Sequence, residues 1–340
     1  MHIHPTTIFF RIIVVFAIIS GIMLSLFSIP SILAVQIRNE QTVPTAPSQF
    51  PITVNPQNKT IVENAQIDAF FASPQSPFQA AALNSGDTLW HVFEWVATSI
   101  ADAPWYQGIA AANAPRFVTI KPGMRKEQVA SIFAKELSWN AKQQKEFMTA
   151  SASSTLPLIE GSFSPGVYTV TVGMTPKETQ ALVNERFTTD ILSHYGPEIA
   201  KQVPLNQALI IASLIQRETI GTNDMRLVSG VIWNRLFINM NLQIDATLQY
   251  AKANMKATTS WWPKVVPADA YLRSAHNTYL NPGLPPSPIA NPSVAAVIAA
   301  LNPIKTSCLF YFNDQNGNIL CTNTYAQHVA LLKKYYGQGK

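Results

Sequence analysis

One glutamate stands at the end of a long apolar run, where its carboxyl group could do acid–base chemistry. Glu218 closes a stretch that starts at residue 205 and is nearly free of charge, so we expect part of its surroundings to be dry. Desolvation disfavours a charged carboxylate and raises its pKa. A carboxylic acid that stays protonated near neutral pH can protonate a glycosidic oxygen. The alternative is a structural ion pair with Arg217, Arg226 or Arg235.

Glu218 belongs to a series of short motifs that follow one another along the chain. In order they are Glu160-Gly161 with Pro165 and Tyr168, then residues 212–219, 231–236, 242–247 with Tyr250, 276–279 and 283–289. Each motif is a weak signal alone, because short matches arise by chance. Together, over roughly residues 117–335, they closely resemble the endolytic murein transglycosylase (YceG-like) family.

The resemblance implies an enzyme of the bacterial cell wall. It implies cleavage of the MurNAc–GlcNAc bond within nascent peptidoglycan, which leaves 1,6-anhydroMurNAc ends and limits strand elongation. It also implies glycan strands as the substrate and peptidoglycan synthases in the membrane as partners. The family often has Glu-x-Glu-Thr where this chain has Gln216-Arg217-Glu218-Thr219, and we assign the proton-transfer role to Glu218.

The implied reaction needs only one carboxylate, whereas a glycoside hydrolase normally needs two. In lytic transglycosylation the C6 hydroxyl of the sugar attacks its own anomeric carbon, so no water is activated and the nucleophile is already held in place. Two alternatives stay open. One is a muramidase-type hydrolase that uses Asp245 as a second carboxylate, and the other is a catalytically weak, membrane-anchored scaffold that binds peptidoglycan.

Five further residues of the matched motifs are candidates for substrate binding. Asn234, Gln243 and Asn277 carry amides that can hydrogen-bond sugar hydroxyls or N-acetyl groups. Tyr279 can pack against a pyranose face, and Asp245 lies in the same series of motifs. For the amides the alternative is capping of helix ends and loops, and for Asp245 it is an N-cap or ion-pair role.

Other residues of these motifs are expected to support the site. Arg235 is expected to tie its helix to Asp224 or Asp245, and Glu160 to accept hydrogen bonds from loop amides. The glycine and prolines of residues 283–286 predict a rigid loop that forms a groove wall.

The rest of the sequence argues against other kinds of site. The six histidines, at positions 2, 4, 91, 194, 276 and 328, are dispersed without paired spacing, so no metal site is expected. A glycine-rich phosphate loop and a Ser-His-Asp signature are also missing, and we expect no cofactor. The net charge of +5 comes from scattered Lys and Arg rather than a basic run, which argues against nucleic-acid binding.

The N-terminal segment predicts a single membrane-spanning helix. Residues 12–29 carry no charge and the apolar character continues to Val35, and about 20 such residues span a bilayer. The alternative is a cleaved signal peptide. Arg11 and Arg38 flank the segment and give little orientation signal, but the short N-terminal flank and the implied activity favour an inner-membrane protein with a periplasmic catalytic domain.

Pattern changes divide the chain further. We expect a cytoplasmic flank and membrane helix over residues 1–36, a polar linker over 37–60, a poorly defined region over 61–116, a small LysM-like subdomain over 117–200 and a catalytic domain over 201–340. In the subdomain, a strand, a Gly-Met turn and a helix occur twice, and such units also occur in glycan-binding folds. Helices and strands mix without regular βαβα alternation, which predicts an α+β class.

The two cysteines flank a predicted hairpin. Cys308 and Cys321 lie on either side of two apolar runs joined by a turn that contains Asn316-Gly317. An oxidising compartment permits a disulfide between them, and two buried thiols are the alternative.

Overall fold

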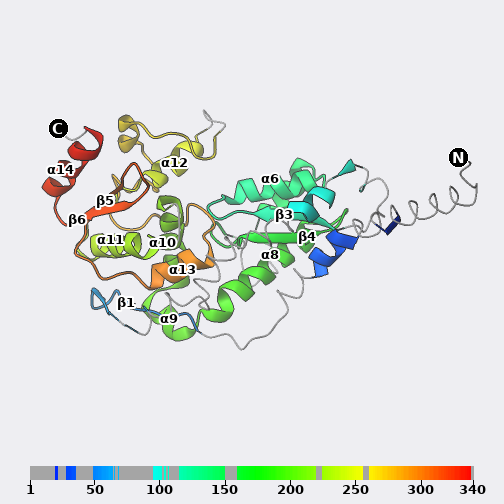
Figure 1. The fold of residues 1–340 in the computed structure, drawn as a ribbon, viewed down its shortest axis with the longest axis horizontal. Helices are drawn as coiled ribbons and strands as arrows, with labels where there is room; N and C mark the ends of the chain where they lie inside the picture. Colours follow the sequence, from blue (N-terminus) through cyan, green and yellow to red (C-terminus); the bar gives the residue numbers. More distant parts are fainter. Residues whose placement is uncertain are drawn as a thin grey trace, which may run out of the picture.

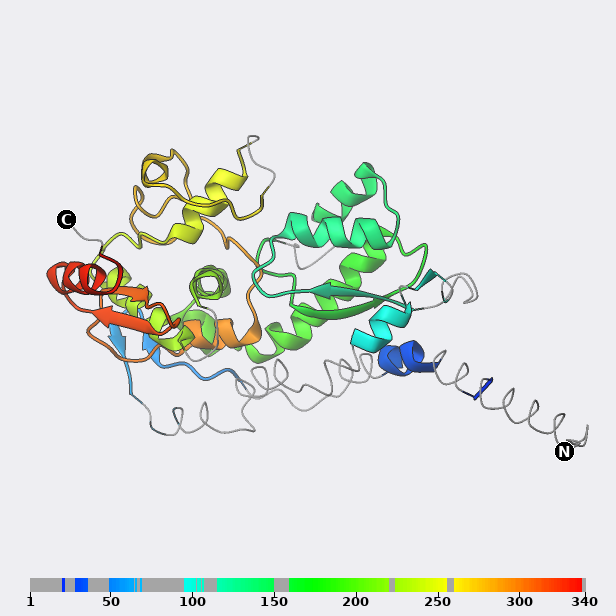
Figure 2. The same ribbon diagram turned by 45° about the horizontal axis from the view of Figure 1, so that its top comes forward.

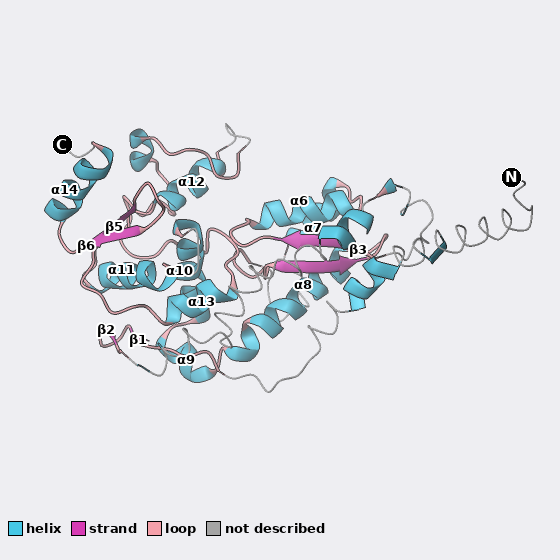
Figure 3. Cartoon of the chain, in the orientation of Figure 1, coloured by secondary structure: helices cyan, strands magenta, loops and turns pink. Residues whose placement is uncertain are grey.

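The computed structural model shows a mixed α+β chain that is mostly helical, with small two-stranded sheets (Figure 3). The expected α+β class is therefore confirmed. The residues described are 20–21, 28–35, 49–63, 65, 68, 95–101, 103–104, 106, 115–149, 159–219, 224–255 and 260–337. Within them the chain forms two packed units, one of elements β3 to α8 and one of elements α9 to α14 (Figure 1).

The first unit is an antiparallel strand pair covered by helices. β3 (Arg116–Ile120) pairs with β4 (Gly166–Val170), and α6 (Lys126–Glu136) and α7 (Ala141–Met148) lie between the two strands in the chain. Helix α8 (Pro176–Asp190) follows β4. Both predicted strand–turn–helix units are present, whereas α7 was not predicted. Glycan binding by this unit stays a prediction.

Local sequence explains where these elements begin and what they bury. α8 begins with a capping box, in which Thr175 and Glu178 satisfy each other's free backbone N–H groups. Pro176 lies in the first turn of the helix, where a backbone N–H has no partner within the helix, so the missing N–H of proline costs nothing. The alternating strands and the helix faces bury one apolar core, which includes Val118, Val129, Phe133, Phe147, Phe163, Tyr168 and Val183.

The second unit is built around α10 (Leu205–Glu218). This helix packs against α11 (Met225–Phe237), α12 (Asp245–Ala253) and α13 (Val294–Leu301) (Figures 1 and 2). Its residues 208–215 are all buried. A helix that is apolar on all sides has to be surrounded by other elements. The short helix α9 (Pro197–Gln202) precedes it. Since α10 is held on several sides, its last residue is held firmly in place.

The chain ends in a hairpin and a helix. β5 (Phe310–Asn313) pairs with β6 (Ile319–Thr322), and α14 (Tyr325–Tyr336) follows. Cys308 and Cys321 form a disulfide, so the structure favours the bridge over two thiols. Because Cys321 lies in β6 and Cys308 just before β5, the bridge closes the open end of this hairpin.

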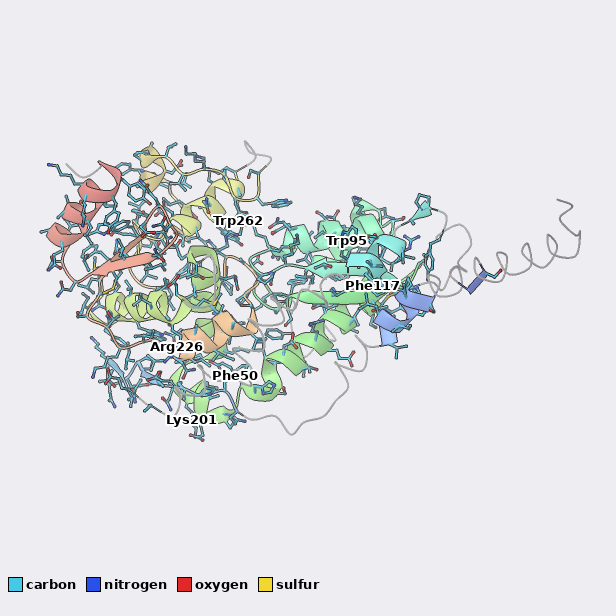
Figure 4. The ribbon with its side chains drawn as sticks, in the orientation of Figure 1. Phe50, Trp95, Phe117, Lys201, Arg226 and Trp262 are labelled. Atoms are coloured by element: carbon cyan, nitrogen blue, oxygen red, sulfur yellow. A yellow bond between two sulfur atoms is a disulfide. The ribbon has the colours of Figure 1, made fainter. Side chains whose placement is uncertain are left out.

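The chain before residue 62 is not a free linker throughout. Strands β1 (Val54–Asn55) and β2 (Thr60–Ile61) form a small hairpin, and the Thr53 N–H donates to the Leu301 carbonyl at the end of α13. Phe50 packs into the core of the second unit (Figure 4). Residues 49–60 of the expected linker therefore belong to the folded part of the chain, because apolar residues such as Phe50 and Val54 gain by burial against the domain.

A buried asparagine joins the two units. The Asn291 side chain accepts hydrogen bonds from the N–H groups of Gly161 and Phe163, and donates to the Met124 carbonyl and to Glu160. Glu160 also accepts from the Lys126 N–H, as the structural interpretation of this residue expected. Burial raises the pKa of Glu160 to about 8, with the charge of Glu127 adding to the effect.

Most of the predicted membrane segment, residues 12–35, lies outside the described residues. Residues 28–35 are helical, and Leu33 is buried against Ala97, Ala101 and Phe117. Among the helices that the structure describes, none is long and apolar enough to cross a membrane.

Candidate functional site

A cleft of about 620 Å³ opens beside the C-terminal end of α10. It is lined by the ends of α10 and α11, the segment that connects α11 with α12, the start of α12, the loop at Tyr279, strand β5 and helix α14. The lining residues are Glu218, Arg235, Met240, Leu242, Gln243, Asp245, Tyr279, Phe310, Tyr311, Tyr325 and His328. The cleft thus combines two carboxylates with several aromatic rings.

Glu218 is the most desolvated acid of this cleft. Its residue is partly exposed because it lines the opening, yet protein atoms surround the carboxyl group, so desolvation raises its pKa. The negative charge of Asp245 raises the pKa further. Hydrogen bonds from the Tyr311 hydroxyl, at 2.9 Å, and from the Ala246 N–H oppose this rise. Desolvation is the largest of these effects, so the acid keeps its proton to higher pH than an ordinary glutamate.

The ion-pair alternative for Glu218 fails. Among the described residues it forms no salt bridge, and the three arginines considered for it have other partners. The Arg217 guanidinium stacks on Trp262 at 3.9 Å from the ring centroid, and Arg226 pairs with Asp68. Arg235 donates to the backbone carbonyls of Leu309, Asn241 and Leu242.

Arg235 therefore has a different role from the one expected. It does not tie its helix to Asp224 or Asp245. Its guanidinium instead joins the end of α11 to the hairpin at Leu309 and to the segment at Leu242. These are two walls of the cleft, so Arg235 sets the distance between them.

The second carboxylate of the cleft is paired with a phenol. Asp245 is exposed, and the Tyr279 hydroxyl donates to its Oδ1 at 2.6 Å. Asp245 is the first residue of α12, whose N-cap is Ile244, so the expected N-cap role is wrong. Tyr279 was expected to pack against a sugar ring, and it does lie in the cleft. Burial raises its pKa, and the bond to Asp245 adds to the rise.

Gln243 is held in the cleft by its backbone. Its φ of 50° lies in the left-handed region, which is unusual for a residue other than glycine. The neighbours Leu242 and Ile244 are buried, and the Gln243 N–H donates to the Thr278 carbonyl. The amide side chain is exposed and lines the cleft, as expected for a sugar-binding residue.

The other two predicted amides are used inside the protein. Asn234 donates to the carbonyls of Thr306 and Cys308, which fixes the chain just before β5. Asn277 is fully buried; it donates to the carbonyls of Ala270 and Leu272. Neither is among the residues that line the cleft, and both use their amides as the capping alternative describes, so sugar binding by Asn234 and Asn277 stays a prediction.

Two more expectations concern residues near the cleft. Gln216, at the position where the family often has its first glutamate, accepts hydrogen bonds from the N–H and hydroxyl of Ser293 at the start of α13. It is not among the residues that line the cleft, which supports the choice of Glu218. The loop at residues 283–286 does not line the cleft either; nearby, Pro288 packs on Gly161, where a Cβ atom would come within 2.9 Å.

Four aromatic residues of the cleft were not predicted: Phe310, Tyr311, Tyr325 and His328. They come from the hairpin and α14, more than 90 residues after Glu218 in the chain. The run of aromatic residues at 310–312 was the available signal. Within the described residues, no group of three or more His, Cys, Asp or Glu side chains could hold a metal ion.

Comparison with known proteins relates this geometry to a family. The model of the YceG-like family matches residues 83–334. A protein of Bacillus subtilis (strain 168) named endolytic murein transglycosylase is 30% identical over 239 residues, which cover 64% of this chain and 64% of that protein. A protein of the same name from Streptococcus pneumoniae (strain D39) is 29% identical over 174 residues, which cover 50% of this chain and 31% of that protein.

The matched part thus spans less than two thirds of either relative's length. A crystal structure of a YceG-like protein from Listeria monocytogenes is similar in fold, with a TM-score of 0.54 and 23% identity; the match covers 70% of this chain and 81% of that one. The family expected from the order of the motifs is confirmed, and the chain belongs to the YceG-like family, whose curated relatives are named endolytic murein transglycosylase.

Proposed function

We propose that this chain is an endolytic lytic transglycosylase that cleaves the MurNAc–GlcNAc bond of nascent peptidoglycan, with Glu218 as its proton-transfer residue. The observation that carries the proposal is the desolvated carboxyl of Glu218 at the edge of an open cleft, without an ion-pair partner among the described residues. The names of the matched relatives support the reaction class.

The proposed reaction transfers one proton in each of two steps. Protonated Glu218 gives its proton to the glycosidic oxygen, and the bond from this oxygen to the anomeric carbon of MurNAc breaks. The carboxylate then takes the proton of the C6 hydroxyl as that oxygen bonds to the anomeric carbon. The products are a GlcNAc-terminated strand and a 1,6-anhydroMurNAc end, Glu218 is protonated again, and no water is consumed.

The Tyr311 hydroxyl supports the intermediate stage. It donates to Glu218 Oε2 and so stabilises the carboxylate that remains after the first proton transfer. Burial raises the pKa of Tyr311 well above its ordinary value, so the phenol stays a donor at neutral pH. A charge-assisted hydrogen bond of this kind is worth about 1.5–3 kcal/mol.

Replacing Tyr311 by phenylalanine is expected to lower kcat by roughly tenfold or more, because one such bond to the carboxylate is lost. The bond now lowers the pKa of Glu218, so its loss raises that pKa and moves the fall of activity at alkaline pH to higher pH. A pH profile of peptidoglycan cleavage measures both effects. Tyr336→Phe is the control, because this phenol binds the Asn313 carbonyl away from the cleft. A Tyr311→Phe profile that matches the control contradicts the assigned role.

The chemical form of the new sugar end tests the reaction type. Digestion of purified peptidoglycan should give fragments that end in 1,6-anhydroMurNAc, as measured by mass spectrometry. A muramidase gives reducing ends that are heavier by one water. This second candidate is kept because Asp245 provides another carboxylate in the same cleft. Predominantly hydrated ends would favour it and reject transglycosylation.

The proposal includes a place in the cell. We propose a single-pass inner-membrane protein, anchored by the apolar segment within residues 12–35, whose catalytic unit faces the periplasm and limits strand growth beside peptidoglycan synthases. The disulfide between Cys308 and Cys321 supports an oxidising compartment.

A further inference from the structure

One wall of the cleft is aromatic and has no part in the proton transfer described above. Phe310 of β5 stacks on His328 of α14, with ring centroids 5.5 Å apart and an interplanar angle of 29°. The ring centroid of Tyr325 lies 5.7 Å from that of Phe310, and 64% of the surface of Tyr325 is exposed. All three side chains line the cleft that contains Glu218. Partly exposed rings of this kind offer apolar faces on which a ligand can pack.

His328 has a ring nitrogen that makes no hydrogen bond within the protein. Its Nδ1 is buried without a hydrogen-bond partner. A proton on Nδ1 would leave a buried donor unsatisfied, which favours the tautomer with the proton on Nε2. Nε2 is not among the buried unpartnered atoms and His328 lines the cleft, so this N–H is available to a ligand there. Desolvation lowers the pKa of His328, and the charge of Arg235 lowers it further, so the ring is neutral at neutral pH. The wall therefore presents a neutral N–H donor between aromatic faces.

We infer that His328, together with Phe310 and Tyr325, forms a contact site for an N-acetylated sugar, in which His328 Nε2–H donates to the carbonyl oxygen of the N-acetyl group. A neutral donor suits a neutral amide oxygen, whereas a positively charged donor would favour an anionic ligand. The aromatic rings pack against the apolar face of the pyranose. This inference rests on the proposed function and names how the same cleft recognises its substrate.

The test measures binding without turnover. In a Glu218→Gln background, calorimetry compares chitotetraose, a β-1,4 tetramer of N-acetylglucosamine, with cellotetraose, which has the same linkage but no N-acetyl groups. His328→Phe keeps a ring in the wall and removes the donor. His328→Gln keeps an amide N–H near the position of Nε2. His194→Phe is the control, because His194 also stacks on a phenylalanine, Phe50, outside the cleft. Thermal midpoints verify folding.

The background protein is expected to bind chitotetraose more tightly than cellotetraose. His328→Phe should weaken chitotetraose binding by about tenfold, the effect of one hydrogen bond, and leave cellotetraose binding unchanged. His328→Gln should recover most of the loss. Equal binding of both sugars, or no effect of His328→Phe, overturns the inference and leaves the role of Glu218 untouched. Activity retained by the Glu218→Gln protein would reject the proposed catalytic function instead.

Discussion

Peptidoglycan cleavage by the Glu218→Gln variant should fall by about 10³-fold or more, while its thermal midpoint stays close to that of the unchanged protein. A single general acid contributes roughly 10²–10⁴-fold, and here one carboxyl group serves both proton transfers. The amide of glutamine cannot give or take the proton. Its carbonyl oxygen can still accept the hydrogen bond from Tyr311, so the packing around position 218 is preserved.

The matched control is Gln216→Ala on the same helix end. Gln216 accepts two hydrogen bonds from Ser293 at the start of α13 and does not line the cleft. Replacement of the Gln216 side chain by alanine is expected to lower the free energy of unfolding by about 1–2 kcal/mol and to leave kcat nearly unchanged. Release of soluble fragments from purified peptidoglycan measures activity, and thermal melts measure stability. The assignment of Glu218 is wrong if Glu218→Gln keeps full activity, or if Gln216→Ala loses activity to the same degree.

The second large effect is expected at Asn291. Asn291→Ala should lower the free energy of unfolding by at least about 3 kcal/mol, because it leaves the N–H groups of Gly161 and Phe163 buried without an acceptor. It also removes the side-chain donor to the Met124 carbonyl and to Glu160, so the contact between the two units is weakened, although the backbone N–H of residue 291 still donates to Met124. Urea unfolding monitored by circular dichroism gives the free energy.

An exposed amide provides the comparison for this variant. Asn281 also donates two hydrogen bonds, to the carbonyls of Ser274 and Asn277, but water can replace these contacts. Asn281→Ala is therefore expected to cost less than about 1 kcal/mol. If the two variants lose the same free energy of unfolding, the joint at Asn291 does not stabilise the fold in the way described.

The proposed mechanism depends on how the fold sets the environment of one acid. Glu218 combines a raised pKa with access to a cleft. A glutamate on the open surface would lack the raised pKa, and a fully enclosed one would lack access to substrate. The rigid α10 places the carboxyl group, and the disulfide-closed hairpin places Tyr311 against it. Arg235 holds the hairpin wall to the segment at Leu242. Most of the supporting residues therefore act on position and electrostatics rather than on the bond that breaks.

Local sequence determined most of the secondary structure. The apolar run before Glu218 predicted α10, because a helix buried on all sides has to be apolar on all sides. The Asn-Gly turn between two apolar runs predicted the last hairpin, and the repeated strand–turn–helix pattern predicted β3, β4, α6 and α8. The order of the motifs indicated the family and, with it, Glu218.

Tertiary structure alone decided which polar residues face the cleft. Asn234, Asn277 and Gln243 carry the same amide group, and the sequence did not distinguish them. Two of them satisfy backbone carbonyls in the interior, whereas a left-handed backbone turns Gln243 outward. The distant residues that share the cleft with Glu218 could not be predicted for a related reason. Tyr311 and His328 reach the cleft only because the distant hairpin packs against α11 and α14 packs against the hairpin. Local periodicity carries no information about such long-range contacts.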